Sequence, residues 1–123
     1  MSDNPNFSFS SDVQLPILDI LEEAGVCFSI KHSDLDYVYR STSLNKLFGI
    51  TGQPANDFEL FVSEVAYEIA QEDGLTLTSG RSDEVERLCI TQDGKEVDVR
   101  LKRSVVNHHE VTLLVTTYTE IHK

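Results

Sequence analysis

The chain has 123 residues, of which 21 are acidic and ten are basic, giving a formal net charge of −11. This length fits one domain, large enough to bury a single core. The acidic excess argues against direct binding of nucleic acid or of an anionic membrane surface, because both require clustered Lys and Arg. No apolar run approaches the roughly 20 residues that span a bilayer. Residues 1–4 lack the features of a secretion signal, so we expect a cytoplasmic protein.

The negative charge is concentrated in the middle of the chain. Residues 1–56 carry a net charge of −4, residues 57–86 carry −8, and residues 87–123 carry +1. The simplest interpretation is a solvated helix face. The alternative is a surface that repels DNA or docks a basic partner.

The first third of the chain reads as a helix followed by two strands. Residues 1–11 are polar and turn-forming, and we expect a flexible lead. Residues 12–24 form an amphipathic helix that Asp12 can cap. Residues 25–31 alternate as a strand, with Val26, Phe28 and Ile30 on one face and Cys27, Ser29 and Lys31 on the other. Residues 37–39 form a second strand, so that the pair makes a hairpin.

A helical block follows the hairpin. Ser41 or Thr42 caps a short helix that Gly49 ends, and residues 50–60 form an irregular link. Helical spacing of apolar residues then runs from residue 61 to residue 70 and can continue to residue 79, with Gly74 as a weak point.

Three strands close the chain, at residues 84–91, 95–106 and 111–118, with turns at 93–94 and 107–109. The last strand is nearly all β-branched or apolar, which predicts a central position covered on both faces. Two strands before a helical block and three after it predict an α+β fold, a five-stranded antiparallel sheet with helices packed on one face. We find no repeats and no second domain.

The cysteines and histidines give no sign of a metal centre. Cys27 and Cys89 make no C-x-x-C pair, and we expect two free buried thiols in preference to a disulfide. The four histidines lie in turns or at the end of the chain, where solvated side chains are usual: His32, His108, His109 and His122. The adjacent pair in the last turn lacks a third ligand, so no metal site is predicted.

Five segments, in order and spacing, resemble a PAS domain of the bacterial sensory-box type. They are FSIKHSDLDYVYRSTSLNKLFGIT, NDFELF, IAQEDGLTLTSG, TQDGKEVDVRLKRSVV and TYTEI. The resemblance runs from about residue 15 to residue 121. The chain departs from the usual pattern at four positions, His32, Leu35, Ser41 and Leu44, where Asp, Gly, Asn and Phe are common.

The resemblance implies sensing and not catalysis. It implies a module of a bacterial signalling protein, such as a histidine kinase, a diguanylate cyclase or a transcriptional regulator, which binds a small ligand or forms a homodimer to control an output domain. The expected layout is a lead at 1–11, a helix at 12–24, the PAS domain at 25–121 and the start of an exit linker at 122–123. A stand-alone module is the alternative to a fragment of a longer chain.

The resemblance also limits which cofactors the chain can be expected to bind. A haem-binding member usually places an axial His on the long helix, and residues 61–79 contain no His, Cys or Met. A flavin adduct needs a Cys before that helix, and residues 50–62 contain none. The chain also lacks Trp and the glycine-rich loops that bind phosphates. We therefore expect an unknown small ligand or no cofactor, with haem and covalent flavin disfavoured.

The predicted ligand cavity is apolar and would lie between the sheet and the long helix. Its candidate lining residues are Phe28, Ile30, Tyr39, Phe48, Phe61, Val65, Ile69, Leu88, Ile90, Leu101 and Val115. The alternative role of these side chains is that of a plain core. Tyr39 also fits a half-buried sheet position, and Arg100 fits an outward-facing one.

The predicted dimer interface is the apolar stripe of the first helix. Its candidate residues are Val13, Ile17, Leu18, Ile20 and Leu21. A ligand-free interaction domain that uses the outer sheet face is an alternative function. A small cone-shaped enzyme is a remote one, because it needs a buried carboxylate. Asp57 and Asp73 are the only plausible residues, and both fit helix caps or solvated helix faces better.

Overall fold

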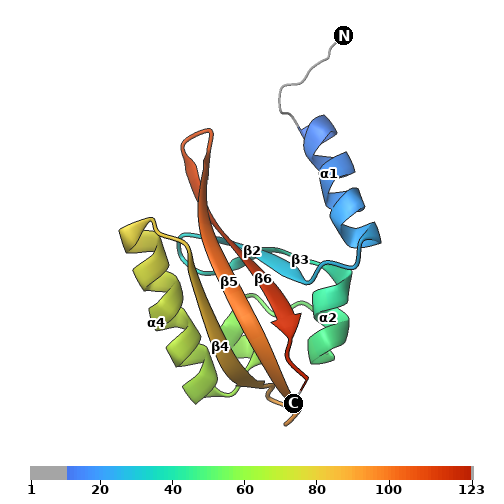
Figure 1. The fold of residues 1–123 in the computed structure, drawn as a ribbon, viewed down its shortest axis with the longest axis vertical. Helices are drawn as coiled ribbons and strands as arrows, with labels where there is room; N and C mark the ends of the chain where they lie inside the picture. The colour runs from blue at the N-terminus through green and yellow to red at the C-terminus, as the bar shows by residue number, and fades with distance from the viewer. Residues whose placement is uncertain (1–10, 123) are drawn as a thin grey trace.

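The computed structural model describes the backbone of residues 11–122 and the side chains of residues 17–122 (Figure 1). The predicted lead falls almost entirely outside the described residues, as does the last residue of the predicted exit linker. The helices and strands are α1 Ser11–Glu23, β2 Phe28–His32, β3 Tyr37–Arg40, α2 Thr42–Phe48, α3 Asp57–Leu60, α4 Ser63–Ser79, β4 Asp83–Ile90, β5 Glu96–His108 and β6 Val111–Glu120.

The five strands form one antiparallel sheet in the order β3-β2-β6-β5-β4. This confirms the predicted fold class and the central position of the last strand. β6 pairs with β2 on one side and β5 on the other, and Thr117 lies opposite both Phe28 and Lys102. The two halves of the sequence, before and after the helical block, therefore meet at the middle of the sheet.

The helix boundaries follow local signals that the sequence carries. Ser41 is the N-cap of α2 and accepts a hydrogen bond from the backbone N–H of Leu44, while Gly49 ends the helix in the left-handed conformation. Helix α4 continues past Gly74 to Ser79, as the longer prediction has it. The link at 50–60 contains one turn of helix, α3, that was not predicted; Asn56 is its N-cap.

The hairpin between β5 and β6 has a tighter turn than predicted. The strands run to His108 and from Val111, so the turn consists of His109 and Glu110 and not of residues 107–109. Both turn residues have positive φ, 50° and 66°, as a two-residue turn that matches the twist of the strands requires. Figure 1 shows this hairpin projecting beyond the rest of the sheet.

Helix α1 lies apart from the other helices and is attached to the body near its C-terminal end (Figure 1). Glu22 accepts hydrogen bonds from the backbone N–H of Thr42, at 3.0 Å, and from the Tyr39 hydroxyl. The bond to Glu22, with burial, raises the pKa of Tyr39 to about 12. One carboxylate thus joins α1 to the start of α2 and to the edge strand β3.

The apolar core lies between the sheet and the helices α2, α3 and α4. Phe48 meets the rings of Phe61 and Tyr118 edge to face, at centroid distances of 5.1 and 5.9 Å. We call the sheet surface that faces this core the inner face. The buried core residues are Leu44, Phe48, Leu60, Phe61, Val65, Ala66, Ile69, Cys89, Val97, Val99, Leu101 and Tyr118.

The opposite, outer face of the sheet carries charged side chains where β4 pairs with β5. Over β2, β3, β6 and the hairpin end of β5 it is apolar and only partly covered. On β6, Leu114, Thr116 and Tyr118 point inward and are buried, whereas Leu113 and Val115 point outward and are half-buried. The prediction that β6 is covered on both faces is therefore wrong. Its outward side chains are apolar because they line an open groove and not because a second layer covers them.

Among the described residues, no helix is both long enough and apolar enough to cross a membrane.

Candidate functional site

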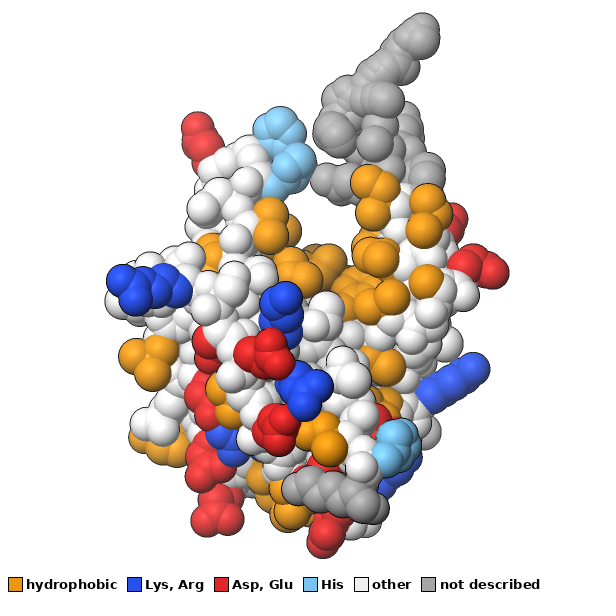
Figure 2. All heavy atoms as spheres, viewed as in Figure 1, with side chains coloured by type: hydrophobic (Ala, Val, Ile, Leu, Met, Phe, Trp, Pro, Cys, Tyr) orange, Lys and Arg blue, Asp and Glu red, His pale blue; other side chains and the backbone are white. Residues whose placement is uncertain are grey.

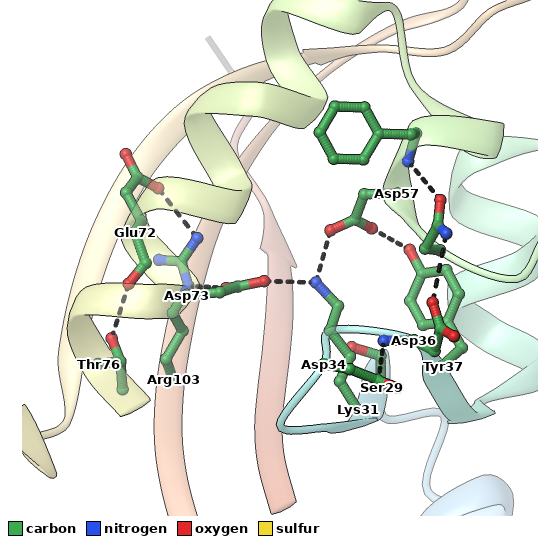
Figure 3. A network of polar contacts seen from close by, with 12 residues as sticks. Ser29, Lys31, Asp34, Asp36, Tyr37, Asp57, Glu72, Asp73, Thr76 and Arg103 are labelled. Carbon is green, nitrogen blue, oxygen red and sulfur yellow. Dashed lines mark hydrogen bonds and ion pairs between the residues drawn. The ribbon is translucent and has the colours of Figure 1, made fainter. Parts of the chain in front are cut away.

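Two cationic side chains are buried on the inner face of the sheet. Strand β5 alternates so that the inward positions after Val99 are Leu101 and Arg103. Strand β2 directs Lys31 to the same face. The exposed fraction is 0% for Arg103 and 1% for Lys31, although Lys and Arg are almost never fully buried unless they are paired (Figure 3).

Asp73 joins the two cations from the helix side. Successive residues at i+4 share one face of a helix, so Asp73 follows Val65 and Ile69 along the buried face of α4. Its Oδ2 accepts a hydrogen bond from Lys31 Nζ at 2.6 Å, and its Oδ1 accepts one from Arg103 Nε at 2.5 Å. Asp73 is 1% exposed, so this three-residue bridge is shielded from bulk solvent.

Asp57 is the second carboxylate on Lys31. Its Oδ2 accepts a hydrogen bond from Lys31 Nζ at 2.5 Å, and its Oδ1 accepts one from the Tyr37 hydroxyl (Figure 3). The interpretation of Asp57 and Asp73 as caps or solvated residues is wrong, because both are buried and the cap of α3 is Asn56. Their carboxylates instead neutralise cations of the sheet.

The network reaches the surface through Arg103 and Arg87. Arg103 donates to Glu72 Oε1 at 2.9 Å and lies 3.6 Å from Asp83 Oδ2. Arg87 on β4 pairs with Glu72 and with Glu68. Carboxylates of the acidic segment 57–86 are therefore bound to cations of the last strands, which accounts for part of the uneven charge seen in the sequence.

Polar groups continue across the middle of the inner face. Thr116 on β6 lies opposite both Ser29 and Arg103, and Ser29 is hydrogen-bonded to the Tyr118 hydroxyl at 3.0 Å. Within the described part of the chain, Thr116 Oγ1 and Arg103 Nη1 have no hydrogen-bond partner although both are buried. Arg103 Nη1 still forms the ion pair with Asp83 Oδ2 at 3.6 Å. An unpaired buried polar atom is costly, so Thr116 Oγ1 marks where a further polar group would be stabilised.

The network shifts the ionisation of its members in the direction that keeps Lys31 charged. Burial acts to lower the pKa of Lys31, but the carboxylates of Asp57 and Asp73, with Tyr118, outweigh it and raise the pKa. Burial, followed by the Asp57 charge, raises the pKa of Tyr37 well above its usual value, and burial also raises the pKa of Tyr118. Both phenols therefore stay protonated at physiological pH.

A groove on the molecular surface adjoins the network at Tyr37. It has a volume of about 420 Å³ and lies between β3 and the link that precedes α3, where Arg40, Pro54 and Ala55 line it. The Arg40 guanidinium lies 4.7 Å from the centroid of the Tyr37 ring, and Lys31 Nζ lies 5.5 Å from the same centroid. The Tyr37 ring therefore stands between the groove and the buried ammonium.

The predicted cavity lining does not form one surface. Five of its members belong to the inner core: Phe48, Phe61, Val65, Ile69 and Leu101. Ile30, Tyr39 and Val115 instead line a groove on the outer face.

The other three residues of the predicted cavity lining also lie in different places. Phe28 is buried with its ring stacked on Tyr39, Leu88 is exposed, and Ile90 is half-buried against the core. The physical reason is strand alternation. It directs Ser29 and Lys31 inward and thus sends Ile30 outward.

The outer groove lies between α1 and the sheet and has a volume of about 400 Å³. Figure 2 shows apolar side chains on both walls of this hollow. Of the predicted dimer residues, Ile17 and Leu18 line it, Ile20 is 65% exposed and Leu21 is half-buried. The side chain of Val13 lies outside the described ones.

The structure also places Arg100 and the two cysteines, for which the sequence made separate predictions. Arg100 faces outward as predicted, paired with Glu84 and Glu86 on the neighbouring strand. Cys27 and Cys89 are both free, as predicted, but only Cys89 is fully buried. Burial raises the pKa of Cys89 to about 12. No group of three metal-ligating side chains occurs within residues 17–122.

The sequence analysis missed the buried network, although two signals for it were present. Arg103 continues the inward alternation of Val97, Val99 and Leu101, and Asp73 follows Ile69 at i+4. Each signal places a charge where a hydrophobic residue is expected.

No protein-family model and no curated protein sequence matches the chain. Solved structures do. The VqmA dimer of Vibrio cholerae, described as a LuxR-type receptor, matches with a TM-score of 0.74 and 16% identity over 88% of this chain and 51% of that chain. VqmA bound to DPO matches with a TM-score of 0.73 and 16% identity over 87% of this chain and 57% of that chain.

Two isolated PAS domains match over their whole length. One, from a two-component sensor histidine kinase, has a TM-score of 0.69 and 10% identity over 91% of this chain and 100% of that chain. The other, from the fruit-fly ELK potassium channel, has a TM-score of 0.69 and 13% identity over 95% of this chain and 100% of that chain. The chain spans about half of VqmA, 51% and 57% in the two structures, but all of these isolated domains. The chain therefore has the fold of a PAS domain.

Proposed function

We propose that this chain is the sensory module of a signalling protein, and that it pairs with a second copy of itself to control an output domain. The fold it shares with a histidine-kinase PAS domain and with a LuxR-type receptor supports this role. The similar solved structures are sensory domains, which supports a sensing role over a catalytic one.

The observation that carries the proposal is the apolar hollow between α1 and the outer face of the sheet. Contiguous exposed apolar surface with polar surroundings marks an interaction site in a folded protein. Ile17 and Ile20 on α1 are 53% and 65% exposed, and Val106 on the opposite wall is 42% exposed. We assign the second copy as the occupant because the similar VqmA is described as a dimer.

The sensing side is the buried network on the inner face. VqmA is described with DPO bound, which supports a small-molecule ligand for the similar domain described here. The donors on the inner face are strongly polar, so we propose a small polar ligand and neither haem nor a covalently bound flavin.

A ligand-free dimerisation module is the second candidate function. The internal pairing of the network favours it, because Lys31, Asp57 and Asp73 already have partners within the chain. Native mass spectrometry of the purified protein distinguishes the two candidate functions. A sensor yields a mass increment for a bound small molecule, whereas a ligand-free dimerisation module yields the mass of the protein alone.

The dimer is tested with two matched double variants. Ile17→Glu/Ile20→Glu places one charge in the hollow and one on the exposed apolar surface of α1 beside it, and Tyr67→Glu/Leu75→Glu places the same two charges on exposed sites of α4. Light scattering after size exclusion should give a monomer for the first variant and a dimer for the second. A wild-type monomer, or a dimer that survives the α1 substitutions, would contradict the proposed pairing.

A further inference from the structure

We propose that the ligand is a small carboxylic acid, and that the Asp57 side chain occupies its place until the ligand displaces it. The inference rests on the proposed sensory role, because it names the chemical class of the molecule sensed.

The first step is the geometry around Asp57. One carboxylate oxygen accepts from the Lys31 ammonium at 2.5 Å, and the other accepts from the Tyr37 hydroxyl. An ammonium and a phenol that each donate to one oxygen of the same group form a carboxylate receptor. In Figure 3 the two donors converge on Asp57 from the sheet. The receptor is therefore complete, and its present occupant is a side chain of the same molecule.

The second step is the difference between Asp57 and Asp73. Asp73 lies inside the 17-residue helix α4 and bridges two cations. Asp57 is the first residue of the four-residue helix α3, directly after the link, and it contacts one cation. Displacing Asp57 leaves the Lys31–Asp73–Arg103 bridge in place, so Asp57 is the exchangeable carboxylate.

The third step is charge. Removing Asp57 from Lys31 unbalances a buried cation, which is strongly destabilising. An incoming carboxylate restores the negative charge and accepts the same two hydrogen bonds, whereas a neutral or cationic molecule does not. The exchange therefore favours an anion of the same kind as the group that leaves.

The fourth step is a buried hydroxyl that has no hydrogen bond. Thr116 Oγ1 lacks a hydrogen-bond partner within the described residues, and Thr116 is 2% exposed. It lies on the inner face of β6, the strand next to β2 and Lys31. A second polar group on the ligand, such as a hydroxyl or another carboxylate, would be stabilised by this hydroxyl. This favours a hydroxy acid or a dicarboxylic acid over a simple fatty acid.

The fifth step is access. The groove of about 420 Å³ ends at Tyr37, the residue that also binds Asp57. Arg40 stands in this groove and donates to the Pro54 carbonyl at 2.9 Å. On a chain of net charge −11, a cation at the groove gives an anion a local site of attraction.

The first test removes the tethered carboxylate. Asp57→Ala creates space beside Lys31 and Tyr37, and Asp57→Asn keeps that space filled. Acetate should stabilise the Ala variant against thermal unfolding, and at ten times its Kd the unfolding constant should fall about 11-fold. Chloride at equal ionic strength should not reproduce this effect, and acetate should leave the Asn variant unchanged.

A folded Ala variant that responds equally to acetate and chloride would overturn the proposal. The second test uses the wild-type protein and so does not depend on whether the Ala variant folds. Titration with malate should produce saturable NMR shifts at the Lys31 side chain and at Tyr37, with smaller shifts at Arg100 on the outer face. Shifts that are absent, or that are uniform over the surface, would also overturn it.

These outcomes separate the inference from the proposed function. A wild-type dimer that retains some other bound small molecule but ignores carboxylates refutes only the ligand class. A monomer that binds malate at Lys31 refutes the proposed pairing and leaves the carboxylate site standing.

Discussion

On the inner face of the sheet, Lys31 and Arg103 are 1% and 0% exposed, whereas on the outer face Leu88 and Val106 are 43% and 42% exposed. The molecule thus buries charges and exposes hydrophobic side chains on opposite sides of the same five strands. Neither face is arranged for maximal stability of an isolated domain, because buried charges carry a desolvation cost and exposed apolar groups gain nothing from the fold.

The difference shows that the two faces have separate tasks. The inner groups are paired within the chain, so their arrangement fixes one geometry for α3, α4 and the sheet. The exposed apolar side chains of the outer face, such as Val106, are not buried within the chain, so their burial depends on another surface. The following substitutions test that division, from the largest expected effect to the smallest.

Arg103→Ala and Arg100→Ala make the same change at two positions of β5, one on each face of the sheet. Arg103 is buried against Asp73 and Glu72, and its removal leaves buried carboxylates without their cation. We expect Arg103→Ala to lower the free energy of unfolding by about 3–5 kcal/mol. Arg100 pairs with exposed Glu84 and Glu86, and Arg100→Ala should not change it measurably. Urea unfolding measures both, and equal losses would remove the distinction between the faces.

Val99→Thr and Val106→Thr repeat the comparison without charge. Val99 is fully buried in the apolar core, where an added hydroxyl has no prepared partner. We expect a loss of about 1–3 kcal/mol in the free energy of unfolding. At Val106, on the wall of the outer groove, the hydroxyl meets water in the single chain, so at concentrations where the protein is monomeric the unfolding midpoint should stay within error. A loss at Val106 as large as that at Val99 under these conditions would remove the distinction between the faces.

Alkaline pH should weaken the inner face first. Burial raises the pKa of Cys89 from 9.0 to about 12, so the folded state holds this proton more tightly than the unfolded state. The associated stability is present below pH 9.0 and is lost as the pH rises toward 12. Cys89→Ala should therefore lose less stability than wild type between about pH 8 and about pH 10.5, by urea unfolding. Equal losses would show that the buried Lys31 and the tyrosines account for the whole effect.

Thiol labelling gives the smallest and simplest contrast. Cys27 is half-buried, whereas Cys89 is fully buried. Because the thiolate is the reactive form and needs access, the native protein should label at Cys27 well before Cys89. Mass spectrometry of peptides after timed alkylation measures the order, and the reverse order would mean that β4 opens more readily than the segment just before β2.

Much of this fold could be predicted because its signals are local. Alternation in residues 25–31 and 95–106, a serine before a short helix and glycines after two helices mark elements that the structure contains. The one-turn helix α3 could not be predicted, because four residues contain no full helical period. The turn at His109 and Glu110 was also missed, because glutamate is not typical of positive φ.

The site was harder to predict because its pattern is the reverse of the usual one. Alternation in β2 was predicted correctly, but Phe28 and Ile30 were placed in the lining of a cavity on the helix side of the sheet, and the structure directs Ser29 and Lys31 there instead. Hydrophobicity identifies the inward face of a strand only when the outward face is polar, and in β2 the apolar side chains face outward. The partners of Asp57 could not be predicted, because Lys31 and Tyr37 come from strands distant in the sequence.

The position of Tyr37 in the sheet has a consequence for backbone dynamics. It begins β3, a four-residue strand at the sheet edge, whereas Thr116 belongs to β6, which is hydrogen-bonded on both sides. Edge strands open at a lower free energy than central ones, so amide protons of β3 should exchange with solvent before those of β6. Local opening at this edge would expose the Asp57 carboxylate while the rest of the sheet stayed intact. A molecule could then reach the interior on a timescale much shorter than that of global unfolding.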